Sequence, residues 1–234
     1  MKRKIFILTA LVMMIFCVNA CAFSDVQSGS WYYDNVTDMT NQGYLSGYED
    51  GTFRPDGTVT KAELVSIVGR IAGLQESAKQ NNHWADGMVQ TALTKGLFDW
   101  DEIPPTAQTY DEPITRQLAV KIVMNAFFKD ERGDYNRVSS SVSDFAQLDG
   151  RYYDSMIAAY CKGIVYGDDK GNLNPKSSIT RAEACAIIMR AASMKGDLKP
   201  YEPTVTEQRT VFTYTAFSCR LRFWLLRHSR LIRF

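Results

Sequence analysis

Apolar residues recur at helical spacing in three stretches of the chain, and each stretch follows a threonine. Leu64, Ile67, Val68 and Ile71 lie three or four positions apart, so they form one stripe of a helix that begins at Thr60. The stripes of the other two stretches, after Thr115 and Thr180, are formed by Ile122, Val123 and Ala126 and by Ile187, Ile188 and Ala191. The pattern therefore predicts three amphipathic helices.

A shorter helical stretch precedes each of these helices. The spacing of apolar residues predicts helices over residues 32–42, 85–95 and 152–162. They end at Gly43, Gly96 and Gly163, and a glycine in the left-handed conformation commonly terminates a helix. A loop with Asp-Gly, Lys-Gly and Pro turn signals then connects the two helices of the first and third copies.

Laying the chain on itself shows that these units are internal repeats. With a shift of 120 residues the first copy lies on the third without a gap, and the shared residues include Gly43, Gly47, Gly51, Pro55 and Thr60. The middle copy is weaker, because its loop has no glycine and gains two prolines. Two amphipathic helices cannot bury both stripes alone, but three such pairs can share one core. We therefore expect a mainly α fold of three tandem helix-loop-helix repeats.

Composition marks the ends of the repeats, which we expect over residues 23–73, 83–128 and 142–194. Residues 1–22 have a basic start, an apolar run and a small-residue cleavage site, which predicts a signal peptide for export. An uncleaved membrane anchor and a lipidated Cys21 stay open as alternatives. Residues 195–234 form a linker and an atypical basic, aromatic tail. We interpret this tail either as a membrane-surface segment or, as we prefer, as the product of a reading-frame change in a longer protein.

Charge and cysteine content narrow the class of protein. Residues 23–203 carry a net charge of −7, which argues against nucleic acid as a partner, whereas residues 204–234 carry +5. Only Cys161, Cys185 and Cys219 follow the expected cleavage site, and three cysteines make no disulfide framework. We expect Cys161 and Cys185 to be buried free thiols, with a bridge between them as the alternative.

The threonine motif fits a helix cap. In Thr60-x-x-Glu63 and Thr180-x-x-Glu183 the hydroxyl accepts a hydrogen bond from the glutamate amide and the carboxylate accepts one from the threonine amide. Such a cap contributes about 1 kcal/mol of stability. Thr115 is expected to cap the middle helix, although Gln117-Leu118 stands where the other copies have Ala-Glu, so its capping box is broken.

The cap does not explain the cation that follows each threonine. Lys61, Arg116 and Arg181 stand at the first helical position, near the positive end of the helix dipole, where a cation is mildly unfavourable. Free amides at such an end favour an anion, so a neighbouring basic side chain suggests half of an anion site. The alternative is a salt bridge to an acidic residue of a neighbouring repeat.

Aromatic residues precede the first helix of two repeats. Trp31 and Trp84 each stand one residue before that helix, where an aromatic face can stack on a sugar ring; a contact with the core is the alternative. In the third copy Arg151 replaces the tryptophan, and Tyr152 is expected to substitute in part.

These residues resemble the S-layer homology module. The likeness rests on Phe23-Ser24-Asp25-Val26, on Trp31 with the stretch NQGYLSGYEDGTFRPDGTVTKAE, and on ITRAEA at 179–184, and it covers residues 23 to 194. The resemblance implies a pseudo-threefold helical bundle with projecting loops. It also implies non-covalent anchoring to secondary cell-wall polysaccharide linked to peptidoglycan, often bearing pyruvate ketals, at the surface of a cell with an S-layer.

The resemblance also implies which residues contact the glycan. Arg181, Arg116 or Lys61 would face the pyruvate carboxylate, and Trp31, Trp84, Gly47 and Gly167 would line grooves between modules. Lys61 departs from the usual arginine and lacks its two-pronged geometry. We expect the third repeat to keep the most familiar site and the second to have none.

Other functions find less support in the sequence. The chain has two histidines, His83 and His228, and no nucleophile elbow, metal-ligand cluster or phosphate loop, so we expect no enzyme, cofactor or metal. His83 is expected to be solvated or to cap a helix. The acidic pairs Glu49-Asp50 and Asp168-Asp169 lack calcium-ligand spacing and are read as turn residues. A protein–protein module that self-associates into a surface lattice, and the remnant anchor of a truncated cell-wall hydrolase, are the alternatives.

Overall fold

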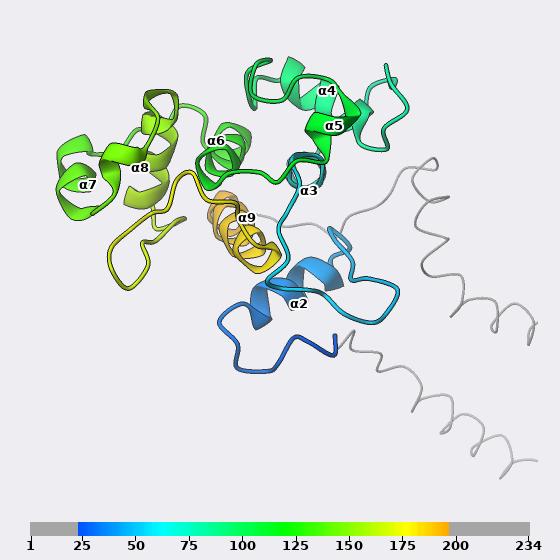
Figure 1. Cartoon of the computed structure of the whole chain (residues 1–234), viewed down its shortest axis with the longest axis horizontal. Helices are drawn as coiled ribbons and strands as arrows, with labels where there is room; N and C mark the ends of the chain where they lie inside the picture. The colour runs from blue at the N-terminus through cyan, green and yellow to red at the C-terminus, as the bar shows by residue number, and fades with distance from the viewer. Residues whose placement is uncertain (1–22, 197–234) are drawn as a thin grey trace, which may run out of the picture. The chain divides into compact units, whose positions relative to one another are not determined.

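The computed structural model describes residues 23–196 (Figure 1). The predicted signal peptide, Cys21 and the atypical tail lie outside the described residues. Regular structure over 23–196 is helical, with isolated bridges in place of strands, so the mainly α prediction is confirmed. None of the helices in this part of the chain has the length and apolarity needed to cross a membrane.

Helices form where the apolar pattern predicts them. The three long helices follow the three threonines and are α3 (Lys61–Ile71), α6 (Arg116–Phe127) and α9 (Arg181–Lys195). The shorter helices that precede them are α2 (Tyr33–Asn41), α4 (Asp86–Thr94) and α8 (Tyr153–Cys161). Gly43, Gly96 and Gly163 follow these shorter helices with φ of 77°, 72° and 73°, which confirms the predicted left-handed ends.

Four short helical elements within residues 23–196 were not predicted from the sequence. They are α5 (Ala107–Tyr110), α7 (Tyr135–Ser141) and the 3₁₀ turns η1 (Phe145–Gln147) and η2 (Gly150–Tyr152). The stretch between the second and third predicted repeats therefore contains a helix, α7. Asp134 accepts a hydrogen bond from the amide of Arg137 and so caps this helix, and Val138 is buried beneath it.

The three long helices form the centre of the bundle, and each shorter helix packs on a long helix of another repeat. α3, α6 and α9 contact one another, and the view in Figure 1 places them between the outer helices. Of the outer helices, α4 packs on α3, α8 packs on α6, and α2 packs on α9. Each repeat thus covers the long helix of the repeat before it, with the first covering the third. Because each long helix is covered by a helix of another repeat, one repeat alone could not bury the apolar stripes of both of its helices.

A cycle of backbone hydrogen bonds joins the starts of the long helices. Val59 donates to the carbonyl of Ile179 at 3.2 Å, Ile179 to that of Ile114 at 3.2 Å, and Ile114 to that of Val59 at 3.0 Å. The three helix starts therefore lie side by side. This cycle agrees with a threefold relation between the repeats, which stays a prediction for the bundle as a whole.

Candidate functional site

Both predicted capping boxes form, at the starts of α3 and α9, but the side-chain cap predicted for the middle long helix, α6, does not. Thr60 accepts from the Glu63 amide at 3.2 Å and its own amide donates to Glu63 at 2.8 Å. The pair Thr180 and Glu183 shows the same two distances. Thr115 occupies the N-cap position of α6 without a side-chain hydrogen bond, so its assignment as a side-chain cap is wrong. The missing glutamate at position 118 removes the other half of that box.

The helix amides that we expected to be free for an anion are already used. The first amide of each long helix donates to a carbonyl of another repeat: Lys61 to Glu112 at 3.0 Å, Arg116 to Ser177 at 2.8 Å, and Arg181 to Gly57 at 2.8 Å. The first amide of each long helix is therefore unavailable to an anion, which corrects that part of the anion-site prediction.

Arg181 is the motif cation that makes the most contacts with a neighbouring repeat. Its Nε donates to the carbonyl of Phe53 at 2.9 Å and its Nη2 to that of Ser46 at 3.1 Å. The Nη1 atom lies 3.8 Å from Glu63, and the side chain keeps 11% of its surface exposed. Arg181, from the third repeat, thus holds the loop of the first repeat at the edge of solvent.

The other two cations make the corresponding contacts around the cycle. Arg116 donates to Glu183 at 3.1 Å and to the carbonyl of Tyr166 at 3.2 Å, while its buried Nε has no hydrogen-bond partner. Burial lowers the pKa of Arg116. Lys61 donates to Glu112 at 2.8 Å.

Salt bridges between repeats, the alternative left open by the sequence, therefore form in all three places. The two arginines face the capping glutamate of the next repeat. The repeat that Lys61 faces has Leu118 at that position, so the lysine reaches Glu112 instead. Contact of these cations with a glycan stays a prediction.

The predicted aromatic and glycine positions divide into exposed and structural ones. Trp31 and Trp84 are 61% and 48% exposed, so their faces are open to solvent. Tyr152 is only 7% exposed, which excludes it as a platform for a sugar, and we drop it from the site. A Cβ at Gly47 would overlap the ring of Phe23 and the carbonyl of Thr52, and one at Gly167 would lie 3.1 Å from the carbonyl carbon of Gly171. Gly47 is therefore needed for close packing, whereas a side chain at Gly167 would require the backbone of Gly171 to move by a few tenths of an ångström.

The middle and third repeats meet in a polar cluster that the sequence did not reveal. Lys121 donates to Asp99 at 2.6 Å and to both oxygens of Glu102 at 3.0 and 2.9 Å. Arg151, which replaces the tryptophan of the third copy, binds Asp101 at 2.8 Å. The extended loop of the middle repeat is therefore tied to the third repeat by charge.

The acidic turn residues accept hydrogen bonds from nearby residues of their own loops. Asp50 accepts from the hydroxyl of Thr52, from the side chain of Arg54 and from the amide of Thr52, and Asp168 accepts from the amides of Asn172 and Lys170. These hydrogen bonds lower the pKa of each carboxyl to about 2. The turn reading is confirmed, and no group of three metal-ligating side chains occurs among residues 23–196.

We expect both carboxyls to stay ionised down to about pH 2. Their pKa values are depressed in the folded state, so they stabilise the loops above the unfolded pKa, and this contribution disappears as the pH falls through about 2. Carboxyl chemical shifts of Asp50 and Asp168 in an NMR titration measure this directly. Midpoints near the ordinary value of about 3.9 would contradict these hydrogen bonds.

His83, Cys161 and Cys185 are the remaining residues that the sequence analysis singled out. The Nδ1 of His83 accepts from the amide of Ala85, the residue before α4, and its Nε2 lies 3.0 Å from Asp111. Because α4 has no side-chain cap and the His83 side chain is 7% exposed, both the capping and the solvated role expected for His83 are wrong. Cys161 and Cys185 are both free, so the alternative disulfide does not form. Cys185 is buried, which raises the pKa of its thiol to about 12, whereas Cys161 is partly exposed.

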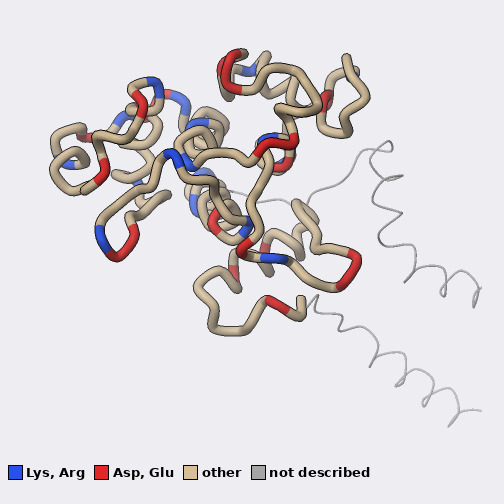
Figure 2. The backbone as a smooth tube through the Cα atoms, viewed as in Figure 1, with Lys and Arg blue, Asp and Glu red and all other residues tan. Residues whose placement is uncertain are grey.

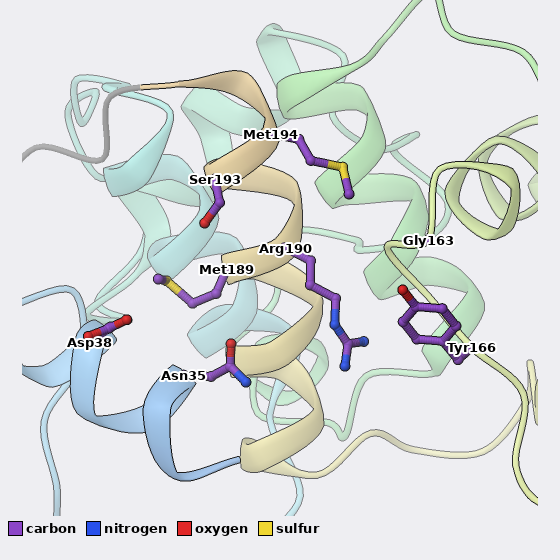
Figure 3. Close-up of a pocket in the computed structure, with 8 residues that line it drawn as sticks. All are labelled: Asn35, Asp38, Gly163, Tyr166, Met189, Arg190, Ser193 and Met194. Atoms are coloured by element: carbon purple, nitrogen blue, oxygen red, sulfur yellow. The ribbon is translucent and has the colours of Figure 1, made fainter. Parts of the chain in front are cut away.

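A separate cleft opens beside the C-terminal half of α9. It has a volume of about 430 Å³, and Figure 3 shows Asp38 of α2 on one side and Tyr166 on the other. The guanidinium of Arg190 points toward the ring of Tyr166 and lies 4.8 Å from its centroid. Tyr166 and Met194 are exposed here, so the cleft presents apolar as well as charged surface.

The fold and the inter-repeat contacts define a modular helical repeat protein. The S-layer homology domain family matches the chain at residues 22–65 and 143–185. These two segments correspond to the first and third repeats. These matches, together with relatives that are surface-layer proteins, place the chain at the cell surface or in the cell wall.

Curated relatives share this part of the sequence. An endoglucanase of Bacillus sp. strain KSM-635 is 29% identical over 183 residues, which are 73% of this chain and 18% of that protein. The cellulosome-anchoring protein of Acetivibrio thermocellus is 24% identical over 163 residues, 63% of this chain and 35% of that protein. The surface-layer 125 kDa protein of Lysinibacillus sphaericus is 24% identical over 184 residues, 74% of this chain and 15% of that protein. The chain spans a minor part of each relative, and it matches the enzyme only through its S-layer homology domains.

Proposed function

We propose that this chain anchors a surface protein non-covalently to the cell wall by binding an acidic, pyruvylated secondary cell-wall polysaccharide between its modules. The observation that supports this most is the meeting of the two family-matched segments. Arg181, in the segment 143–185, lies against the loop from Ser46 to Phe53, in the segment 22–65. Relatives with anchoring and surface-layer names agree with the same role.

The proposed grooves differ in what they offer a ligand. The proposed groove at Arg181 combines this arginine, whose side chain is 11% exposed, with the glycine loop of the first repeat, and the exposed Trp31 belongs to that first repeat. Lys61 and Arg116 are placed in the other two grooves, with Trp84 and Gly167 as further contacts. The repeat boundaries proposed from the sequence, 23–73, 83–128 and 142–194, contain all of these residues.

Binding to isolated wall sacculi tests the proposal. We expect the protein to sediment with sacculi and to stay in solution once the secondary polymer has been stripped by acid, because the ligand is then absent. Residual binding to peptidoglycan alone is measured with the same stripped material. Equal sedimentation with intact and stripped sacculi would reject the proposal.

A second candidate function is self-association into a surface lattice. The observation that favours it is the cleft beside α9, where Tyr166 and Met194 expose apolar surface. Sedimentation velocity without any wall material separates the two functions, since a lattice module forms oligomers as its concentration rises. A monomer at all concentrations that binds only unstripped sacculi supports anchoring alone.

A further inference from the structure

The cleft beside the C-terminal half of α9 lies away from the motif cations. Arg190, which lines it, follows Arg181 by nine residues, and that length of helix spans about 14 Å. The volume of the cleft, about 430 Å³, is in the range of small-molecule sites. The cleft is therefore a candidate site separate from the contacts made at the start of α9.

Two opposite charges line this cleft without neutralising each other. Asp38, on α2, and Arg190, on α9, both line it, yet neither forms an ion pair with any residue between 23 and 196. Acidic positions are frequent in the loops around the bundle, as Figure 2 shows, so an exposed Asp38 alone would carry no argument. The informative feature is that an unpaired carboxylate and an unpaired guanidinium belong to one cavity.

Arg190 is held so that one edge of its guanidinium stays available. Its Nη1 donates to the carbonyl of Ile164 at 3.2 Å, and its Cζ lies 4.8 Å from the ring centroid of Tyr166. The hydroxyl of Tyr166 lies 2.9 Å from where a Cβ would stand on Gly163, so the tip of the ring is packed against the backbone. Nε and Nη2 of Arg190 donate to no described residue, and together they form an edge that binds a carboxylate with two parallel hydrogen bonds.

The surface between the two charges is aliphatic. Figure 3 shows Met189 between Asp38 and Arg190, and the exposed Met194 stands one turn after Arg190 along α9. Methionine side chains adapt to the shape of an apolar ligand. A ligand that matches all of these features has an ammonium, a hydrocarbon stretch and a carboxylate. A lysine side chain close to the free C-terminus of a peptide has this chemistry.

We infer that this cleft binds a short peptide with a lysine next to its free C-terminus. The lysine ammonium binds Asp38, the lysine methylenes lie on Met189 and Met194, and the C-terminal carboxylate binds the Nε–Nη2 edge of Arg190. The site goes beyond the proposed anchoring function, because its ligand is a peptide and it uses none of the motif cations. A second copy of the chain is the competing occupant.

Titration of the whole chain with N-acetyl-Ala-Lys-Ala tests the site. We expect saturable shifts of the Met189 and Met194 methyl signals in NMR spectra, with a dissociation constant on the order of 1 mM, because the contacts are few and partly exposed. The C-terminal amide of this peptide lacks the carboxylate, and acetylation of its lysine removes the ammonium. Each of these analogues is expected to bind about fivefold more weakly or worse. Equal binding of either analogue, or the absence of saturable shifts, would overturn the inference.

Asp38→Asn assigns the ammonium contact, since the carboxylate has no described partner to lose. This variant is expected to bind the parent peptide about fivefold more weakly and no longer to distinguish it from the acetylated-lysine peptide. Asp34→Asn, the same change on α2 outside the cleft, is expected to leave the affinity unchanged. An equal loss in both variants would reveal a general charge effect and reject the site. Methyl shifts that grow with protein concentration in the absence of peptide would show that a second copy fills the cleft, which also rejects it.

Discussion

Lys121→Ala is expected to lower the free energy of unfolding by about 3 kcal/mol, because it removes the nearer of two cations from a buried carboxylate. Glu102, whose side chain is 1% exposed, accepts two of the three hydrogen bonds that Lys121 donates. The amide of Asp99 also donates to Glu102, but an amide cannot neutralise the charge, and the half-exposed Arg151 stays 3.9 Å from Oε1. Urea unfolding followed by circular dichroism gives the free energy.

Two comparison variants show whether burial of the charge causes the expected loss of stability in Lys121→Ala. Lys162→Ala removes a salt bridge to Glu131 that lies at the surface, and its cost is expected to be below about 1 kcal/mol. Replacing both partners, as in Lys121→Met with Glu102→Leu, is expected to recover most of the lost stability, since no charge is left buried. A cost for Lys121→Ala as small as that for Lys162→Ala would show that the cluster is solvated.

Arg181→Ala is expected to weaken binding to wall polysaccharide by about tenfold or more, with the helix content unchanged. The variant removes a cation from the proposed groove and also releases the two loop carbonyls, of Ser46 and Phe53, that Arg181 holds. Calorimetric titration measures the affinity, and far-ultraviolet circular dichroism measures the helix content. Unchanged affinity would reject Arg181 as part of the binding site.

Hydrogen exchange in the same variant distinguishes direct contact from positioning. Tyr48 donates its amide to the carbonyl of Thr52 across the loop, so its exchange rate reports on loop order. If Arg181 only positions the loop, exchange at Tyr48 rises as affinity falls. If Arg181 contacts the glycan, affinity falls with little change in exchange. Arg181→Lys keeps the charge without the two-pronged geometry and is expected to retain part of the affinity.

Local features of the sequence predicted the local structure well. The three shorter helices begin and end within one residue of the predicted positions, and the three long helices begin directly after the predicted threonines. Both capping boxes form, at Thr60 and Thr180. These features depend on hydrogen bonds and apolar contacts between residues at most four positions apart, so the residues that decide them are adjacent in the sequence. The missing capping box at Thr115 was also predictable, because Leu118, three positions away, replaces the glutamate that the box needs.

The candidate site was predicted only in part, because its contacts join distant residues. The sequence identified the motif cations and the exposed tryptophans, but Tyr152 is buried and the helix amides are occupied. It gave no sign that Arg181 reaches Phe53, which is 128 positions away. Tyr48 and Arg54 lie in a turn-rich loop, and nothing in the turn pattern indicated that Arg54 and Arg181 would both lie over the ring of Tyr48.

The sequence by itself determined the three helix-loop-helix repeats, their caps and the position of each cation at a helix start. Only the tertiary structure decided that each repeat covers the long helix of its predecessor, and that each cation binds the loop of another repeat. The physical reason is that periodicity tells which face of a helix must be buried without telling which partner buries it. That choice is made when all three repeats pack together, and it brings Arg181 to the loop of the first repeat.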